Sequence, residues 1–310
     1  MPCVHVLWYH DGVAITALLV ANPNAGRIRG AAGLARIEQL LRAAGLDVEL
    51  VAAQGPERVA DSVAAILRGV RRAETRVVVA GGDGTIRSVL PALQGTEIPL
   101  AILPAGSVNV LARELGIPRS LEASAAVAAT GDVRQIDLGL ANGSPFTLMA
   151  GLGFDAAVVH SVAQSVKNVI GSFAYVAKGL QLLARHPPSI FRITADGSAL
   201  EATAWLAVAA NASRYTYSWH LSPDARIDDG WLDLCLFQAS SPAEGLMQAA
   251  AALAGRHSSH PGVSHLRARR LVFECEPPVA LQLDGDPAGH SPVTVEVAPG
   301  ALRVVVPKAS

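Results

Sequence analysis

The sequence predicts an α/β protein that has an N-terminal Rossmann-like domain on a parallel sheet and a C-terminal β-rich sandwich domain. Strand-like and helix-like segments alternate over the first part of the chain, which is typical of a parallel sheet covered by helices. Later segments are mostly strand-like and are separated by turn signals such as Asn142-Gly143. The length of 310 residues also favours two domains. We place them at 14–132 and 133–310.

The elements of the first domain follow in order from apolar runs and helical spacing. Strands are predicted at 15–20, 48–51, 77–80 and 99–103. Helices are predicted at 34–44, 59–70, directly after Gly84, at 108–115 and at 121–129. In an open sheet of this kind, ligands bind beyond the carboxyl ends of the strands. The turns that follow these strands are therefore the first places to search for a site.

The second domain is predicted from short runs rich in apolar and β-branched residues. These runs lie at 135–140, 146–150, 191–195, 202–210, 232–237, 271–275, 280–283, 293–297 and 302–306. One long helical insert, at roughly 157–184, interrupts them. Its lysines, Lys167 and Lys178, lie among apolar residues, as in a helix on a membrane surface or in a packed helix with one solvated face.

Composition narrows the possible partners and the compartment. The net charge of −1 gives no basic signature for nucleic acid, so no nucleic-acid partner is expected. Three separated cysteines indicate neither a disulfide framework nor a metal cluster. No apolar run is long enough to span a bilayer, and the first residues lack the basic start of a signal peptide. We therefore expect a cytoplasmic protein.

The most informative motif is a glycine turn, Gly81-Gly82-Asp83-Gly84-Thr85, directly after a predicted strand. Glycines let the backbone approach a ligand closely, and amides at a helix N-terminus bind anions. An acid inside such a turn would repel phosphate unless a cation lies between them, which suggests that Asp83 acts through Mg²⁺. The alternative is an ordinary strand–helix connection.

Two further turns follow predicted strands and strengthen the phosphate interpretation. One reads Asn22-Pro23-Asn24-Ala25-Gly26, and the other begins the stretch LPAGSVNVLARELGIP at 103–118. Because the carboxyl ends of parallel strands meet at one edge of a sheet, three such turns can surround one nucleotide.

Two acidic turns in the second domain are candidates for chemistry. Asp284-Gly285-Asp286 ends a predicted strand, and two close carboxylates would raise the pKa of one of them and make it a better base. Its alternative is a plain β-turn, for which Asp-Gly is favoured. The second turn, at 228–230, contains Asp228 and Asp229. It can hold a divalent ion through a carboxylate and nearby carbonyls, or it is simply a solvated acidic turn.

The segment GLGFDA at 151–156 fits a dinucleotide fingerprint but lacks the βαβ surroundings that this fingerprint requires. Taken in order, the motifs NPNAG, GGDGT and PAGSVNVLARELGIP, then GLGFDA, PDARIDDGWLDL and LQLDGDP, resemble the diacylglycerol kinase-type lipid kinases. The resemblance runs from about residue 15 to the C-terminus. The glycine turn alone is shared with NAD kinases, whereas the ordered set is highly specific.

The resemblance implies ATP and Mg²⁺ as cofactors. Ser107 stands where the family commonly has Thr, Asn109 matches its Asn, and Val110 stands where many members have Asp. The implied nucleotide-binding set is Asn22, Pro23, Asn24, Ala25, Gly26, Gly81, Gly82, Asp83, Gly84, Thr85, Ser107 and Asn109.

The resemblance also assigns roles in the second domain. Its proton acceptor lies in the tripeptide at 284–286, where this chain has Asp286 in place of the family's Glu, so Asp284, Asp286 and Asp83 are the candidate catalytic residues. A structural Mg²⁺ would be held by the Asp229 side chain and by the backbone oxygens of Arg226 and Trp231.

Asp155, from GLGFDA, would bind a hydroxyl of the lipid headgroup, or it is simply an acid at a helix start. The predicted function is an ATP-dependent lipid kinase, which transfers the γ-phosphoryl group to a hydroxyl of diacylglycerol, a sphingoid base or a related lipid. It would reach its substrate peripherally, at the inner membrane surface, and a homodimer is possible. The alternatives are a NAD kinase-like enzyme with a soluble acceptor and a non-catalytic nucleotide- or lipid-binding protein.

Overall fold

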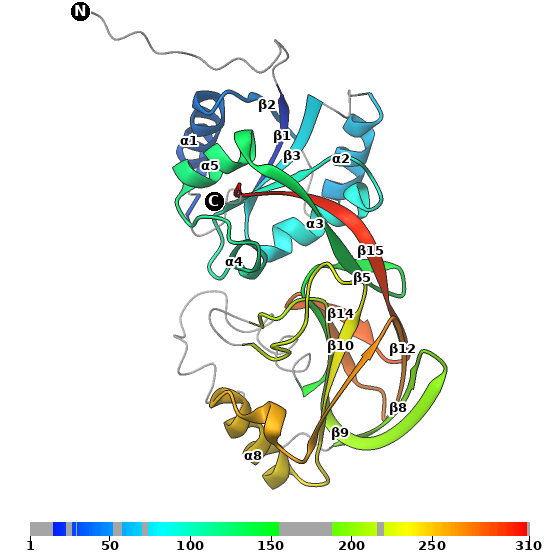
Figure 1. The fold of residues 1–310 in the computed structure, drawn as a ribbon. Helices are drawn as coiled ribbons and strands as arrows, with labels where there is room; N and C mark the ends of the chain where they lie inside the picture. The colour runs from blue at the N-terminus through cyan, green and yellow to red at the C-terminus, as the bar shows by residue number, and fades with distance from the viewer. Residues whose placement is uncertain are drawn as a thin grey trace, which may run out of the picture.

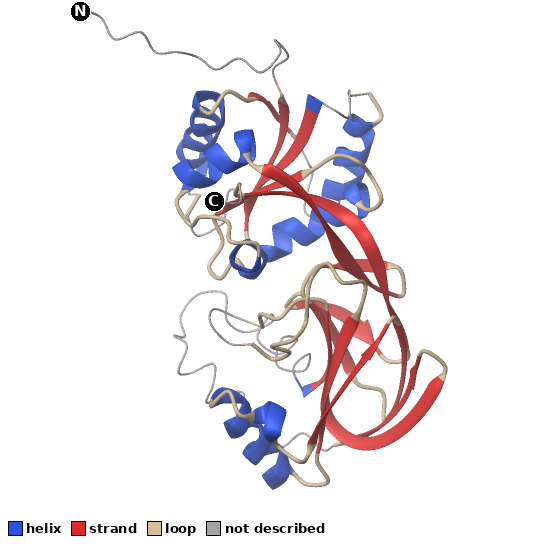
Figure 2. Cartoon of the chain, viewed as in Figure 1, coloured by secondary structure: helices blue, strands red, loops and turns tan. Residues whose placement is uncertain are grey.

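The computed structural model describes residues 15–22, 27–28, 30–51, 58–69, 74–154, 188–215 and 220–308. It contains an N-terminal lobe of helices around a parallel sheet and a C-terminal lobe made largely of strands, as Figure 1 and Figure 2 show. The predicted fold class is therefore confirmed. The helical insert expected at 157–184 lies outside the described residues.

The parallel sheet of the N-terminal lobe has the strand order β2-β1-β3-β4. Its strands are β1 (Thr16–Ala21), β2 (Asp47–Leu50), β3 (Thr75–Gly81) and β4 (Leu100–Pro104). Both β1 and β4 pair with β3 in parallel, so Ala21 lies opposite Ala80 and Gly81 lies opposite Pro104. The turns that follow these three strands therefore start side by side at one edge of the sheet.

Helices cover both faces of this sheet because alternate strand residues point to opposite sides. On one face, Leu19 and Val78 share a core with α1 (Gly30–Ala43) and α5 (Leu121–Thr130). On the other face, neighbouring strand residues pack with α2 (Val59–Leu67) and α3 (Asp83–Leu93). The short helix α4 (Val110–Glu114) follows β4.

A long antiparallel ribbon of β5 (Asp132–Ala141) and β15 (Val293–Val306) runs from one lobe into the other (Figure 1). The end of β15 pairs in parallel with β4 through Val304 and Leu100. The parallel sheet thus includes the C-terminal strand of the chain. The predicted boundary between residues 132 and 133 falls at the start of this ribbon and stays a prediction.

Short and long strands build the C-terminal lobe. They are β6 (Ser144–Phe146), β7 (Met149–Gly153), β8 (Ser189–Ala195), β9 (Ser198–Ala210), β10 (Leu232–Gln238), β11 (Val263–Ala268), β12 (Arg270–Glu276), β13 (Ala280–Leu283) and β14 (Asp286–His290). Helix α8 (Pro242–Leu253) and the 3₁₀ turn η3 (His257–Ser259) follow β10. The central strand β9 pairs with β7, β8 and β10.

The strand predictions differ from the structure where turn residues and sheet edges mislead. The run predicted at 146–150 is divided between β6 and β7, and the two runs predicted at 293–297 and 302–306 form one strand, β15, with an irregularity between Ala298 and Leu302. Strand β14 was not predicted, because Pro287 and Gly289 are poor strand formers away from a sheet edge. It lies at the end of the strand order.

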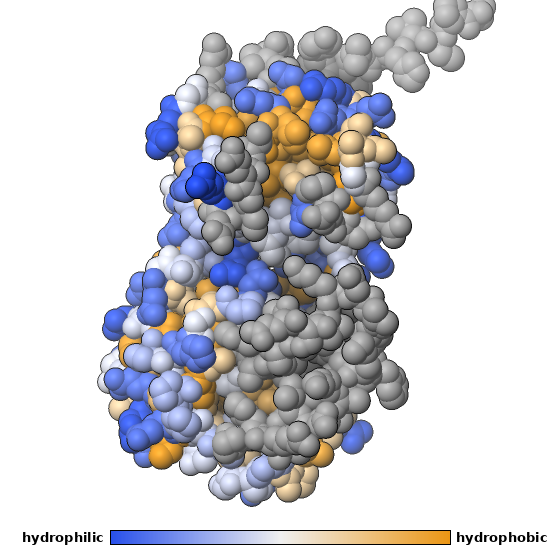
Figure 3. Space-filling view, turned by 180° about the vertical axis from the view of Figure 1, so that it is seen from behind, coloured by the Kyte–Doolittle hydropathy of each residue, from blue (hydrophilic) through white to orange (hydrophobic). Residues whose placement is uncertain are grey.

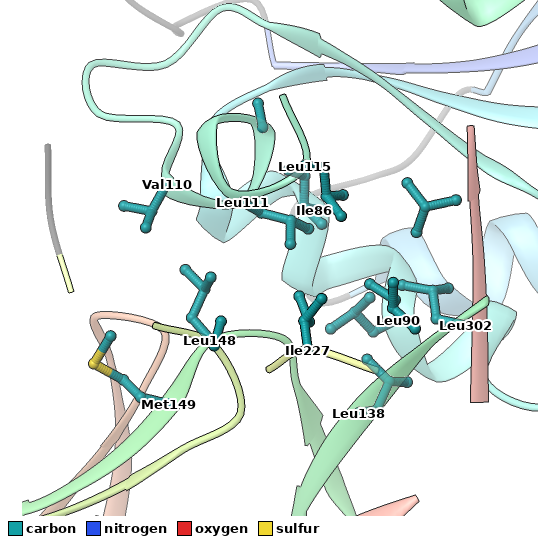
Figure 4. Close-up of a cluster of buried hydrophobic side chains, with 14 of the residues drawn as sticks. Ile86, Leu90, Val110, Leu111, Leu115, Leu138, Leu148, Met149, Ile227 and Leu302 are labelled. Atoms are coloured by element: carbon teal, nitrogen blue, oxygen red, sulfur yellow. The ribbon is translucent and has the colours of Figure 1, made fainter. Parts of the chain in front are cut away.

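The two lobes share a buried apolar cluster, shown in Figure 4. Ile86 and Leu90 of α3 and Leu111 of α4 meet Leu148 and Ile227 from the C-terminal lobe. This packing fixes α3 and α4, which follow the glycine turn and the β4 turn, against the strands of the other lobe. A site that needs residues from both lobes is thereby prearranged.

Seen from behind, apolar residues gather among charged ones on part of the N-terminal lobe (Figure 3). Leu50 of β2 is 45% exposed and is one of the large apolar side chains that face solvent. The predicted homodimer stays a prediction.

Candidate phosphate and acceptor site

The chain directly after β1 and the turns after β3 and β4 lie together at the carboxyl end of the parallel sheet, as the sequence predicts. The amide of Asn22 donates to the carbonyl of Ala80 at 3.2 Å. The carbonyl of Gly81 accepts hydrogen bonds from the amides of Ala105 and Gly106, at 3.0 and 3.1 Å. The chain after β1, the glycine turn after β3 and the turn after β4 are therefore joined by backbone hydrogen bonds.

Gly82 and Gly106 bring the two later turns into direct backbone contact. A Cβ atom on Gly106 would lie 2.5 Å from the Cα of Gly82, closer than real Cβ contacts allow. The absence of a side chain at Gly106 is therefore required for this approach. This contact explains why the PAGS sequence that faces the glycine turn also contains a glycine, Gly106.

Helix α3 starts at the glycine turn and presents its N-terminus there. Gly82 is the N-cap, and its carbonyl accepts the amides of Thr85 and Ile86 at 3.0 and 3.1 Å. Among the described residues, no partner is found for the amides of Asp83 and Gly84. Free amides at a helix start carry partial positive charge and bind anions. The turn has the donors that a phosphate needs.

Asp83 has a structural role that sequence reasoning missed. Its Oδ2 accepts the amide of Val110 at 3.0 Å, and its Oδ1 accepts the amide of Leu111 at 3.1 Å. The carboxylate thus accepts hydrogen bonds from two amides at the N-terminus of α4. An N-cap side chain does the same for its own helix, but Asp83 lies on α3. It holds α4 against the start of α3.

Asn109 shapes the turn before α4. The residue is buried and adopts a left-handed conformation, with φ of 54°. Its Oδ1 accepts the amide of Gly106 at 2.9 Å, and its Nδ2 donates to the carbonyl of Gly106 at 2.7 Å. The side-chain amide of Asn109 therefore stabilises the loop through Gly106. Ser107 is the exposed residue at the tip of this turn, and Val110 is buried in the shared core.

The Asp284-Gly285 pair forms the tight turn between β13 and β14, with positive φ at both residues. The carboxylate of Asp284 accepts four hydrogen bonds: the amides of Leu148 and Met149 at 2.8 and 3.0 Å, and the amide and hydroxyl of Thr147 at 2.8 and 2.9 Å. Withdrawal from water raises the pKa of Asp284, and these hydrogen bonds oppose that rise. The cause is burial, not repulsion by Asp286 as the sequence suggested.

Asp286 lies on the other side of this turn, beside the glycine turn at 81–85. A Cβ atom on Gly84 would lie 3.3 Å from the Asp286 Oδ2 atom, so the carboxylate is directly next to the glycine backbone. The same oxygen accepts a hydrogen bond from Nη1 of Arg87 at 3.1 Å. The Asp286 side chain is 46% exposed and that of Arg87 is 24% exposed.

Sequence reasoning missed Arg87, although a signal for it was present. Arg87 lies three residues after Gly84 and four after Asp83 on α3, so it faces the same side of the helix. Among the described residues, its other guanidinium nitrogens have no partner. The site therefore brings together the helix start, a free guanidinium edge and a half-exposed carboxylate.

The second acidic turn is separate from this site. Asp228 accepts hydrogen bonds from Nε and Nη2 of Arg134, at 3.2 and 2.5 Å. Asp229 accepts the Trp231 amide at 3.1 Å through Oδ1 and forms an ion pair with Arg267 through Oδ2. Within the described part of the chain, no hydrogen bond or ion pair joins this turn to the glycine turn.

The donor set at Asp229 does not fit the Mg²⁺ that the resemblance implies. Mg²⁺ takes an octahedral shell of oxygens, whereas a guanidinium already lies against the one carboxylate available. Over the described residues, no three His, Cys, Asp or Glu side chains are grouped so that they could hold a metal. The assignment to Asp229, Arg226 and Trp231 stays a prediction.

Several predicted site residues lie outside the described residues. These are Pro23, Asn24, Ala25 and Gly26 of the first turn and Asp155 after β7. Asn22, directly before them, is exposed. Their assignment to nucleotide and lipid stays a prediction.

Two family models together cover nearly all of the chain. Residues 16–141 match the diacylglycerol kinase catalytic domain, and residues 149–306 match the YegS C-terminal NAD kinase beta sandwich-like domain. The chain is 32% identical to a diacylglycerol kinase of Mycobacterium tuberculosis (strain CDC 1551 / Oshkosh), over 96% of this chain and 97% of that protein. It is 35% identical to a YegS-like lipid kinase of Pseudomonas aeruginosa (strain UCBPP-PA14), over 76% and 77% of the two chains.

The fold is also found in solved structures. A diacylglycerol kinase structure from Bacillus anthracis str. Sterne has a TM-score of 0.69 at 20% identity, and it covers 96% of this chain and 98% of its own. Yeast NADH kinase has a TM-score of 0.50 at 13% identity, over 97% of this chain and 85% of its own. At these identities the comparison shows the fold alone.

This protein belongs to the diacylglycerol kinase and YegS-like lipid kinase family. The members are phosphotransferases, so the prediction of a kinase is confirmed, and the kinase family implies the use of ATP. Within the described residues, none of the helices is both long enough and apolar enough to cross a membrane.

Proposed function

We propose that this protein transfers the γ-phosphoryl group of ATP to a hydroxyl of diacylglycerol, a sphingoid base or a related lipid. One observation supports the proposal most strongly: the contact between Gly84 and Asp286. It puts the glycine turn of one lobe next to an acidic residue of the other. Phosphoryl transfer needs this proximity, because catalysis rests mainly on positioning and charge neutralisation.

ATP would enter as its Mg²⁺ complex, which is the substrate. The amides of Asp83 and Gly84 would bind phosphate oxygens at the positive end of α3. The turn is rigid there, because Asp83 is tied to α4 and Gly81 is tied to the turn after β4. A rigid donor set costs no reorganisation when charge develops on the phosphoryl group.

Asp286 is a better proton acceptor than Asp284. All the oxygens of Asp284 are engaged by Thr147, Leu148 and Met149. Asp286 keeps nearly half of its side chain exposed and lies beside the glycine turn. A general base must reach the proton that it removes, so geometry selects Asp286. A lipid hydroxyl would dock between this carboxylate and the γ-phosphoryl group.

Arg87 would serve the same step from α3. Its Nη1 orients Asp286, and its remaining nitrogens can face the phosphoryl oxygens, whose charge spreads in the transition state. The hydrogen bond also explains how an Asp can serve here: Arg87 holds the shorter side chain in one position.

The acceptor would be presented by a membrane. Lipids with a free hydroxyl stay in bilayers, so the protein would dock peripherally at the inner membrane surface from the cytosol. Lys167 and Lys178 are the proposed docking cations, since basic residues are attracted to anionic headgroups. Added salt should weaken this attraction. A role in phospholipid metabolism would follow.

A NAD kinase-like reaction is the second candidate, since yeast NADH kinase shares the fold. Radiolabelled ATP, offered with vesicles that contain diacylglycerol, with vesicles that contain sphingosine, or with NAD in solution, separates the candidates. We expect label in the organic phase, and on the order of a hundredfold less with Asp286→Asn under the same conditions. Label on NAD with none in any lipid would overturn the proposal. No label on any acceptor would favour a non-catalytic binding protein.

A further inference from the structure

Protein groups neutralise both acids of the turn at 228–230. Arg134 of β5 holds Asp228 through two nitrogens. Arg267 of β11 pairs with Asp229 and also reaches Asp233, whose Oδ1 lies 3.5 Å from its Nε. Arg267 and Asp233 are opposite each other across β10 and β11, so the strand register places the guanidinium here. Because a guanidinium on β11 neutralises Asp229, this carboxylate needs no dissolved cation for charge balance.

The backbone of the turn is also fixed by protein groups. The buried carboxylate of Asp137 accepts the amide of Gly230 at 2.6 Å and that of Gly300 at 2.7 Å. The amide of Asp137 donates to the carbonyl of Ile227 at 2.7 Å. The turn is therefore joined to both strands of the β5–β15 ribbon. Fixing a turn in this way is the work that a structural ion does in a loop without such contacts.

Trp231 helps to keep Arg267 in place. The guanidinium of Arg267 lies over the indole ring, 5.5 Å from its centroid, and that of Arg269 lies over the same ring at 4.7 Å. Such contacts favour a cation, and they pre-order the Arg267 side chain beside Asp229. A divalent ion at Asp229 would have to remove Arg267 from this position or lie beside its charge, which repels it.

We propose that Arg267 takes the place of the divalent cation that lipid kinases of this type are expected to hold at this turn. The guanidinium neutralises Asp229, bridges it to Asp233 and closes the turn against β11. This chain therefore keeps the acidic motif but does not bind Mg²⁺ at Asp229. The inference does not depend on which acceptor is phosphorylated.

Removal of the guanidinium should convert the turn into a cation site. A cavity of about 350 Å³ beside Arg267 is lined by Asp224 and Asp233, among others. Ser222 also lines it, and its buried hydroxyl has no hydrogen-bond partner among the residues that the structure describes. Without Arg267, Asp229 and Asp233 would be left without the cation that they share. Mg²⁺ is often bound through one or two carboxylates and keeps several of its waters, so these two acids suffice for a weak site.

The test is thermal unfolding of the full chain without nucleotide, in a chelator and in excess Mg²⁺, together with calorimetric titration of Mg²⁺. The wild-type protein should show the same Tm in both solutions and no saturable heat. Arg267→Ala should unfold earlier in chelator and regain about 2–4 °C in saturating Mg²⁺, since a ligand that binds only the folded state raises Tm. Arg269→Ala is the matched control, because it removes a cation from Trp231 but none from Asp229; its Tm should not depend on Mg²⁺.

Two further variants keep the test decisive if Arg267→Ala does not fold. Arg267→Met keeps an apolar stem over Trp231 and should become Mg²⁺-dependent, whereas Arg267→Lys keeps a cation and should not. A wild-type Tm that rises saturably with Mg²⁺, with the response lost in Asp229→Asn, would overturn the proposal. The absence of any Mg²⁺ response in both the Ala and Met variants would overturn it as well. Because the readout is stability, failure here differs from failure to phosphorylate a lipid.

Discussion

The two acidic turns of the C-terminal lobe look alike in sequence and differ in what surrounds their carboxylates. In the turn at 228–230, Arg134 and Arg267 neutralise both acids. In the turn at 284–286, backbone amides enclose Asp284, while Asp286 stays half-exposed beside the glycine turn. An acidic residue becomes a candidate for catalysis when its neighbours leave its carboxylate accessible and when a site for the reacting group lies beside it.

The donors also differ in kind between these turns. Amides from the β6–β7 connection bind Asp284, so that acid joins two segments of one lobe. A side chain from the other lobe binds Asp286, so that acid lies where the lobes meet. The comparison predicts that loss of Asp284 harms the fold, that loss of Asp286 harms the reaction, and that loss of Arg134 harms neither strongly.

The largest effect should follow Asp284→Ala. The substitution leaves the amides of Thr147, Leu148 and Met149 without their acceptor, and each unsatisfied buried group costs about 1–3 kcal/mol. We expect the free energy of unfolding to fall by about 3 kcal/mol or more, measured by denaturant titration. A variant that is as stable as the wild type would show that these contacts are weak.

Asp286→Asn should lower kcat by on the order of a hundredfold or more, because an amide cannot accept the proton. Its circular dichroism and its melting curve should match those of the wild type, since the side chain is half-exposed. Asp286→Glu restores the residue that is usual in the family and should keep activity within about tenfold. Normal turnover by Asp286→Asn would move the acceptor role elsewhere, with Asp284 as the next candidate.

Arg87→Gln should lower kcat by about tenfold and raise the KM for ATP, because it removes a positive charge beside the glycine turn and a hydrogen bond to Asp286. Arg87→Lys should recover part of the loss. Arg303→Gln, which removes an exposed ion pair with Glu97, is a control that should leave both constants unchanged. An equal effect of the two Gln variants would contradict a role in the reaction.

The smallest effect should follow Arg134→Gln. Asp228 and Arg134 are both well exposed, and exposed ion pairs contribute about 0–1 kcal/mol. The free energy of unfolding should fall by no more than about 1 kcal/mol, and high salt should reduce the difference from the wild type. A larger loss would mean that the turn depends on Arg134 as well as on Asp137.

Much of the fold could be predicted from the sequence because periodicity and turn residues are local. The alternation of strands and helices up to α5 was recognised from apolar spacing, and Asn142-Gly143 and Asp284-Gly285 form turns with positive φ, as Asn-Gly and Asp-Gly favour. The sequence predicts two separate strands at 293–297 and 302–306 in place of β15, because Pro299 and Gly300 are poor strand formers. Pairing with β5 on both sides of this point keeps it one strand.

The candidate site was predictable in part for the same reason. Glycines and acids at strand ends identified the turn at 81–85 and the tripeptide at 284–286. Sequence reasoning could not separate Asp284 from Asp286, because both follow the same strand. It also could not find Arg87 or the capping role of Asp83, since their partners lie 199 and 27 residues away in the chain.

The sequence by itself determined the family, the class of fold and the turns that carry chemistry, because motif order and apolar periodicity are written along the chain. Only the tertiary structure decided what each acid does. It enclosed Asp284 in amides, left Asp286 beside Gly84 and placed Arg267 against Asp229. The physical reason is that the state of a carboxylate depends on desolvation and on nearby donors. Strand register and the packing of the two lobes set the desolvation and the donors, because they bring together residues that are far apart in sequence.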